Sequence, residues 1–152
     1  AQEGRGGVLR RRALVPLTGR ADPDALRWAM EYRLGMSGWS VTLLALTVLP
    51  SPTPLESGGL PGLRREAERA AGELSERGVE AEALSAAVRS VADAAEFAEG
   101  FDAVILVRGF VSDEEGMELL RALLGRGLRV PVIWVGEWDR GFKGGGGSSP
   151  GR

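Results

Sequence analysis

The chain contains neither cysteine nor histidine among its 152 residues. Without cysteine it has no disulfide, no thiolate nucleophile and no cysteine-ligated metal. Without histidine it lacks the commonest general base and metal ligand. These two absences remove most hydrolase, redox and zinc chemistries, so we expect a protein that is not an enzyme, with no catalytic residue and no metal site.

Long apolar runs and a strong charge of one sign are also missing. No run approaches the roughly 18 to 20 apolar residues that span a bilayer, and the start lacks the successive basic, apolar and small-residue regions of a signal peptide. The formal net charge of −2 gives no overall attraction for nucleic acid. We therefore expect a cytoplasmic protein with no nucleic-acid partner.

The length and the hydrophobic content of 43% are those of one compact domain. Residues 1–8 and 139–152 are rich in glycine, serine or charge, which is typical of flexible segments. The sequence therefore predicts one α/β domain over residues 9–138.

Apolar segments of strand length alternate with helical patterns inside that domain. Strands are predicted over residues 13–17, 40–49, 101–107 and 130–136, with a weaker one over 79–85. The last two of the strong runs are almost continuously apolar, which is typical of parallel strands covered on both faces.

The predicted helices carry recognisable ends. Asp22 is a suitable N-cap for a first helix that begins at Pro23 and stops near Gly35. Further helices are predicted over 62–77, over 91–99 and after the capping-box residues 112–115. This alternation predicts a doubly wound open sheet, whose ligands lie at the carboxyl ends of the strands, next to the loops after the first and fourth strands.

The order of these segments resembles the universal stress protein family. The stretch ALVPLTGRADPDALRWAM is similar to that family's first strand and helix, and WSVTLLALTVLP to its second strand. LSERGVEAEAL, VADAAEFAEGFDAVILVRG and VPVIWV follow in the family's order. The resemblance implies a five-stranded parallel sheet of order 3-2-1-4-5, a cytoplasmic setting, and dimers paired through the last strand.

Members of this family that bind ATP carry an acidic residue after the first strand. After the fourth strand they carry Gly, two residues, Gly, nine residues, then Gly followed by Ser or Thr. In this chain Thr18 replaces the acid, Gly109 matches the first glycine, and Ser112 and Ala122 stand where the other two are due. The resemblance therefore implies a degenerate member.

Electrostatics gives the same answer without the motif. A phosphate cradle needs free backbone N–H groups at a helix N-terminus and a field that favours an anion. The helix after the fourth strand begins with Asp113, Glu114 and Glu115, Glu118 follows one turn later, and Arg108 is the one nearby cation. These carboxylates occupy the positive end of the helix dipole, so the sequence disfavours ATP and predicts no cofactor.

Two functional hypotheses remain. The first is a non-catalytic regulatory domain that acts through dimerisation or through regulation of a partner. The second is a stress-response protein that binds a small molecule or a nucleotide through altered contacts at Thr18, Arg108, Gly109 and Ser112.

The last strand is the candidate dimer interface. An apolar strand at the edge of a sheet is an aggregation risk unless it is covered, and pairing with a second copy would cover it. The alternative is that the segment after Gly136 folds back over this edge. The interface residues that we predict are Val130, Val132, Ile133, Trp134 and Val135.

The basic run of Arg10, Arg11 and Arg12 precedes the first strand. Its plain interpretation is a solvated strand start, and the sharper one is a segment that faces anionic lipid. The run, and a start at Ala1 where an initiator Met is missing, motivate a more specific hypothesis. In it the chain is the cytosolic regulatory domain of a membrane transporter or antiporter, to which such domains occur fused.

Overall fold

The computed structural model describes residues 11–55, 60–127 and 130–136. These residues form a five-stranded sheet of order β3-β2-β1-β4-β5, in which every pair of neighbouring strands is parallel. The predicted fold class and strand order are confirmed. The strands are β1 (Arg12–Leu17), β2 (Ser40–Val48), β3 (Ala81–Val88), β4 (Ala103–Val107) and β5 (Val132–Val135).

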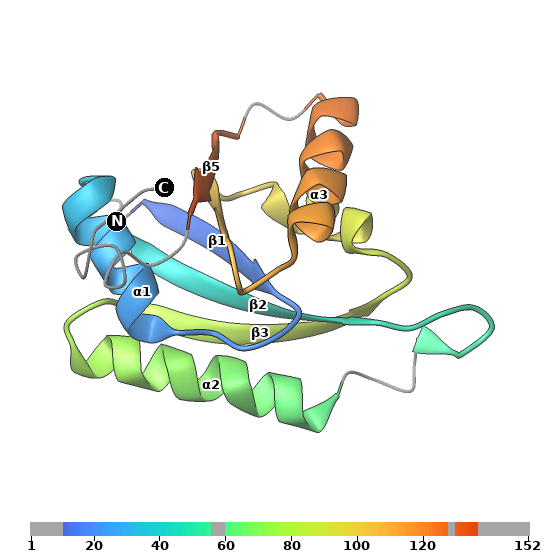
Figure 1. Cartoon of the computed structure of the whole chain (residues 1–152), viewed down its shortest axis with the longest axis horizontal. Coiled ribbons are helices and arrows are strands. Elements are labelled where there is room, and N and C mark those ends of the chain that lie inside the picture. The colour runs from blue at the N-terminus through green and yellow to red at the C-terminus, as the bar shows by residue number, and fades with distance from the viewer. Residues whose placement is uncertain (1–10, 56–59, 128–129, 137–152) are drawn as a thin grey trace, which may run out of the picture.

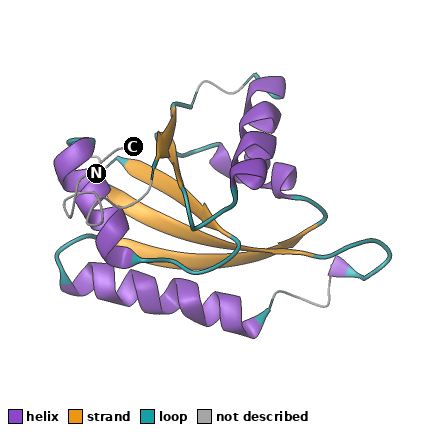
Figure 2. Ribbon diagram, viewed as in Figure 1, coloured by secondary structure: helices purple, strands orange, loops and turns teal. Residues whose placement is uncertain are grey.

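Helices cover both faces of this sheet (Figures 1 and 2). One face carries α1 (Pro23–Trp28), which continues as the π-helical turn η1 (Ala29–Arg33), and the longer α2 (Pro61–Glu76). The other face carries the 3₁₀ helix η3 (Val91–Ala98) and α3 (Asp113–Gly125). The predicted flexible segments at residues 1–8 and 139–152 lie outside the described residues.

The core is divided into two layers by the sheet. Along β1, Val15 and Leu17 face the layer that α1 and α2 cover, while Leu14 faces η3 and α3. All three side chains are buried. Strands with apolar side chains on both faces are stable only when helices cover both faces, which explains the near-continuous apolar runs of β1, β2 and β4.

Most predicted boundaries shift by one to three residues in the structure, and the last strand, predicted over 130–136, spans only Val132–Val135. The strand predicted over 79–85 extends to Val88, because β2 continues alongside it and pairs Val48 with Val88. The strand predicted from residue 101 begins at Ala103, since Phe101 closes a turn by donating its N–H to the Ala98 carbonyl. The third helix is a 3₁₀ helix that ends one residue before the predicted limit.

Local signals mark the start of α1 and the end of α2 in the structure. Asp22 Oδ1 accepts the N–H groups of Asp24 and Ala25 at 3.0 and 3.3 Å. Gly78 follows α2 with a φ of +88°, a conformation that L side chains rarely adopt. These signals depend on neighbouring residues alone, so the sequence could reveal them.

Candidate functional site

The turns after β1 and β4 meet at the carboxyl edge of the sheet, where the strand order reverses. The backbone N–H groups of Thr18 and Gly19 both donate to the Phe110 carbonyl, at 2.9 and 3.2 Å. A cavity of about 380 Å³ lies at this junction. Its lining includes all four predicted ligand-binding residues, namely Thr18, Arg108, Gly109 and Ser112.

The structure thus brings these four residues together, and ligand binding by them remains a prediction. Gly109 adopts a φ of +102°, so the turn after β4 requires glycine at this position. Ala122, which stands at the spacing of a third motif glycine, lies within α3 and packs against the core, away from this edge.

Glu115 binds the polar groups at the start of α3. Its Oε1 accepts the Ser112 N–H at 2.8 Å, while its own N–H donates to Ser112 Oγ at 3.0 Å. This is the reciprocal capping box that the sequence predicts. The same Oε1 also accepts the Thr18 hydroxyl at 2.7 Å, which connects α3 to the turn after β1.

Arg108 is already paired with a carboxylate of its own chain. Its Nε and Nη2 donate to the two carboxylate oxygens of Asp113 at 3.0 and 3.3 Å. Both side chains are about half exposed, so this pair contributes little to stability. The Arg108–Asp113 pair matters for electrostatics, because the Asp113 carboxylate offsets the positive charge that Arg108 could offer to an anionic ligand.

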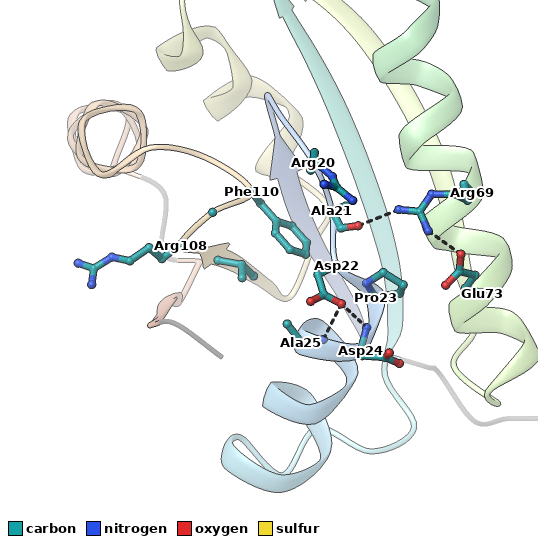
Figure 3. A pocket seen from close by; sticks show the side chains of 12 residues that line it. Arg20, Ala21, Asp22, Pro23, Asp24, Ala25, Arg69, Glu73, Arg108 and Phe110 are labelled. Carbon is teal, nitrogen blue, oxygen red and sulfur yellow. Dashed lines mark hydrogen bonds and ion pairs between the residues drawn. The ribbon is translucent and has the colours of Figure 1, made fainter. Parts of the chain in front are cut away.

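A larger cavity of about 570 Å³ lies on the α1 and α2 face of the same edge. Figure 3 shows the Phe110 side chain directed toward the turn after β1, while Arg108 points away from this cavity. Arg20, Arg69, Glu73 and Phe110 are among the lining residues that sequence reasoning missed.

A clamp from α2 holds the turn after β1 in place. Glu66 Oε2 accepts the Ala21 N–H at 2.9 Å, and Arg69 Nη2 donates to the Ala21 carbonyl at 3.0 Å. The hydrogen bond from Arg69 lowers the pKa of Glu66 below its ordinary value. The spacing of Glu66, Arg69 and Glu73 on one helix indicates ion pairs, but only the tertiary structure shows that they hold this turn.

The carboxylates at the start of α3 do not converge on one point. Asp113 is directed to Arg108 and Glu115 to Thr18. Among the described residues, no three acidic side chains are grouped in a way that would hold a metal ion. Within the same ranges, no helix has the length and apolar character needed to cross a membrane.

The predicted interface strand β5 forms one edge of the sheet. Val130, Val132 and Trp134 pack on the η3 and α3 layer, and Ile133 and Val135 pack on the opposite layer. All five are only partly buried within one chain.

Trp134 lies directly against α3. A Cβ atom at Gly116 would be only 2.1 Å from Cζ3 of the Trp134 ring. Glycine at this position therefore permits the close contact between β5 and α3.

The described part of the basic run contacts aromatic rings of the same chain. The guanidinium carbon of Arg11 lies 5.7 Å from the centre of the Trp39 ring. That of Arg12 lies 4.3 Å from the centre of the Phe101 ring. Arg10 lies outside the described residues, so the structure places only the last two of the three arginines.

No family model and no curated protein matches this sequence. Solved structures do match. A universal stress protein from Archaeoglobus fulgidus in complex with dAMP aligns with a TM-score of 0.59 and 16% identity, over 84% of this chain and 99% of that chain. One from Burkholderia pseudomallei gives a TM-score of 0.56 and 21% identity, over 82% and 94% of the two chains. One from Arabidopsis thaliana with AMP bound gives a TM-score of 0.54 and 17% identity, over 84% of this chain and 92% of that chain.

The fold and the carboxyl-edge site define a doubly wound α/β protein. More particularly, this chain has the fold of the universal stress proteins. The fold predicted from the order of sequence segments is therefore confirmed. Because the sequence identities to these structures are low, the similarity establishes the fold alone.

Proposed function

We propose that this chain is a universal-stress-type regulatory domain that is not an enzyme and does not use the family-type ATP site. One observation carries the proposal: the groups that would receive a phosphate are already bound to carboxylates of the chain itself. The Ser112 N–H and the Thr18 hydroxyl bind Glu115, and Arg108 binds Asp113. A triphosphate would have to displace these carboxylates and would meet their negative charge.

Calorimetry with ATP and Mg²⁺ tests this proposal directly. We expect no heat of binding from the wild-type chain at ATP concentrations up to about 1 mM. A dissociation constant of that size corresponds to a binding free energy of only about −4 kcal/mol. Micromolar binding of ATP would overturn the proposal.

Pairing of β5 with β5 of a second copy is the proposed route of dimerisation. The carbonyls of Pro131 and Val135 accept N–H groups of β4 and of the residue after it at 2.9 and 3.0 Å. Because backbone groups alternate along a strand, those of Val132 and Trp134 face away from β4. They are the groups that a partner strand would bind.

Sedimentation equilibrium of Val132→Pro tests this pairing. Proline removes one outward N–H and leaves the hydrogen bonds between β4 and β5 in place, so we expect the wild type to be a dimer and the variant a monomer. Val132→Thr, which keeps both the N–H and the branched side chain, is the control and should remain dimeric. A monomeric wild type, or a dimeric Val132→Pro, would contradict pairing through this edge.

The second candidate is a stress-response protein that binds a small molecule through an altered site. The cavity of about 570 Å³ favours it, because that volume is within the range of small-molecule sites. Two of the similar structures contain dAMP or AMP. Binding of AMP to the wild-type chain, abolished by Arg20→Gln at the cavity rim, would support this candidate over the first.

A more specific form of the first proposal is that this chain lies in the cytoplasm and regulates a membrane transporter or antiporter. The basic run at residues 10–12 motivates it. The complete reading frame that encodes the chain tests it: membrane-spanning segments in the same polypeptide would support the hypothesis, and a frame that encodes this domain alone would remove its basis.

A further inference from the structure

We infer that the hydrogen bond between Thr18 and Glu115 is a latch that shuts the crevice between β1 and β4 against phosphate-bearing ligands. This inference rests on the proposed function, because it explains how a chain with this fold would exclude a nucleotide from the edge of its sheet. It also adds a prediction that the proposed function does not make: loss of one side chain releases the phosphate-binding groups at the crevice.

The latch joins two elements that are far apart in the sequence. Thr18 lies in the turn after β1, and Glu115 belongs to the first turn of α3, 97 residues later. The distance of 2.7 Å between their oxygens is that of a charge-assisted hydrogen bond. Glu115 is held ready for this contact, since the Ser112 N–H binds the same oxygen.

The crevice has a cavity on each side. The smaller cavity, of about 380 Å³, is lined by both latch residues, and the larger one, of about 570 Å³, opens on the α1 and α2 face. Arg108, Gly109 and Phe110 line both. A ligand that spans the edge of the sheet would therefore pass the latch.

The latch also consumes the donors that an incoming phosphate would use. The Thr18 hydroxyl and the Ser112 N–H converge on one carboxylate oxygen, much as they would converge on a phosphate oxygen. Glu114, the preceding residue, carries the same charge, yet it is exposed and its side chain makes no hydrogen bond or ion pair within the described ranges. Glu115 therefore differs from Glu114 in its position and contacts, and not in its charge.

Calorimetry of Glu115→Ala with AMP and, separately, with inorganic phosphate tests the latch. We expect the association constant for AMP to exceed the wild-type value by roughly tenfold or more, because a juxtaposed like charge is removed and two donors are released. Phosphate alone should bind in the same variant if the released donors recognise the phosphoryl group. Glu114→Ala is the matched control, and it should behave as the wild type does.

Thr18→Val separates the contact from the charge. It removes the hydroxyl while keeping a branched side chain, and the Glu115 carboxylate stays in place. We expect a gain in AMP binding that is smaller than that of Glu115→Ala, because the carboxylate still repels phosphate, and faster amide exchange in the turn after β1 and in the first turn of α3. Unchanged exchange in both segments would show that the contact is no latch.

The outcomes distinguish the latch from the function on which it rests. Tight AMP binding by the wild type would overturn the proposed function. Failure of Glu115→Ala to bind either ligand, or an equal gain in Glu114→Ala, would overturn the latch and leave the proposed function intact. If Glu115→Ala does not fold, Glu115→Gln tests the charge alone, because it removes the like charge while its amide oxygen can still accept from Thr18 and Ser112. We expect a smaller gain in AMP binding in that variant, and no gain at all counts against the latch.

Discussion

Because Gly116 contacts Trp134, we predict that Gly116→Ala destabilises the wild-type chain but stabilises a variant in which the Trp134 ring is absent. Gly116 lies inside α3, where alanine is ordinarily better than glycine by about 1 kcal/mol. A Cβ at this position would lie 2.1 and 2.2 Å from Cζ3 and Cη2 of Trp134, too close for the ring to stay where it is. Helix propensity and packing therefore act in opposite directions.

The packing cost should exceed the gain in helix propensity. Forcing extra atoms into a packed site costs about 1 to 3 kcal/mol, and the partly exposed Trp134 ring can yield only by leaving its contact with α3. We therefore expect Gly116→Ala to lower the free energy of unfolding by up to about 2 kcal/mol. In a Trp134→Ala background the obstacle is absent, and the same substitution should raise the free energy of unfolding by up to about 1 kcal/mol.

Urea unfolding followed by circular dichroism measures both effects as a double-mutant cycle. Gly72→Ala is the matched control, because Gly72 is an exposed helical glycine and a Cβ at its position would have no neighbouring atom within 4 Å. It should stabilise the chain in either background. The reasoning is refuted if Gly116→Ala stabilises the wild type as Gly72→Ala does, or if the coupling with Trp134 is below about 0.5 kcal/mol.

Three further predictions concern single polar contacts. Arg69 lowers the pKa of Glu66, so the Glu66 carboxylate stabilises the fold most above the ordinary glutamate pKa. The loss of stability in Glu66→Gln should therefore be complete above that pKa and should vanish as the pH falls through the lowered one. Urea midpoints of both proteins across this pH range measure the difference. Ser112→Ala removes the cap of α3 and should cost about 1 kcal/mol in urea unfolding; a loss near zero would contradict the capping geometry. Arg89→Met removes the guanidinium that donates to the carbonyls of Leu49, Pro50 and Thr53, so amide exchange in that loop should accelerate, and unchanged exchange would mean that other contacts hold it.

Much of the fold could be read from local patterns. The apolar runs predicted five strands, and the caps at Asp22 and Ser112 predicted where two helices begin, because a cap involves only residues within one helical turn. The extension of β3 to Val88 could not be read in this way. It depends on the length of β2, the strand beside it.

The candidate site divides in the same way. The acidic start of α3 predicted that an anion would be disfavoured there, and the topology predicted that the turns after β1 and β4 would meet. The sequence did not predict that Glu115 would accept the Thr18 hydroxyl. Nor did it predict that Glu66 and Arg69 would hold Ala21 from α2.

The sequence by itself determined the alternation of strands and helices, the helix caps and the absence of cysteine and histidine chemistry. Those properties follow from composition, hydrophobic period and contacts within a few residues. Only the tertiary structure decided which carboxylate closes the crevice, which residues line the larger cavity and why Gly116 must be small. Each of these depends on side chains from different elements meeting at ångström distances, which a one-dimensional pattern does not encode.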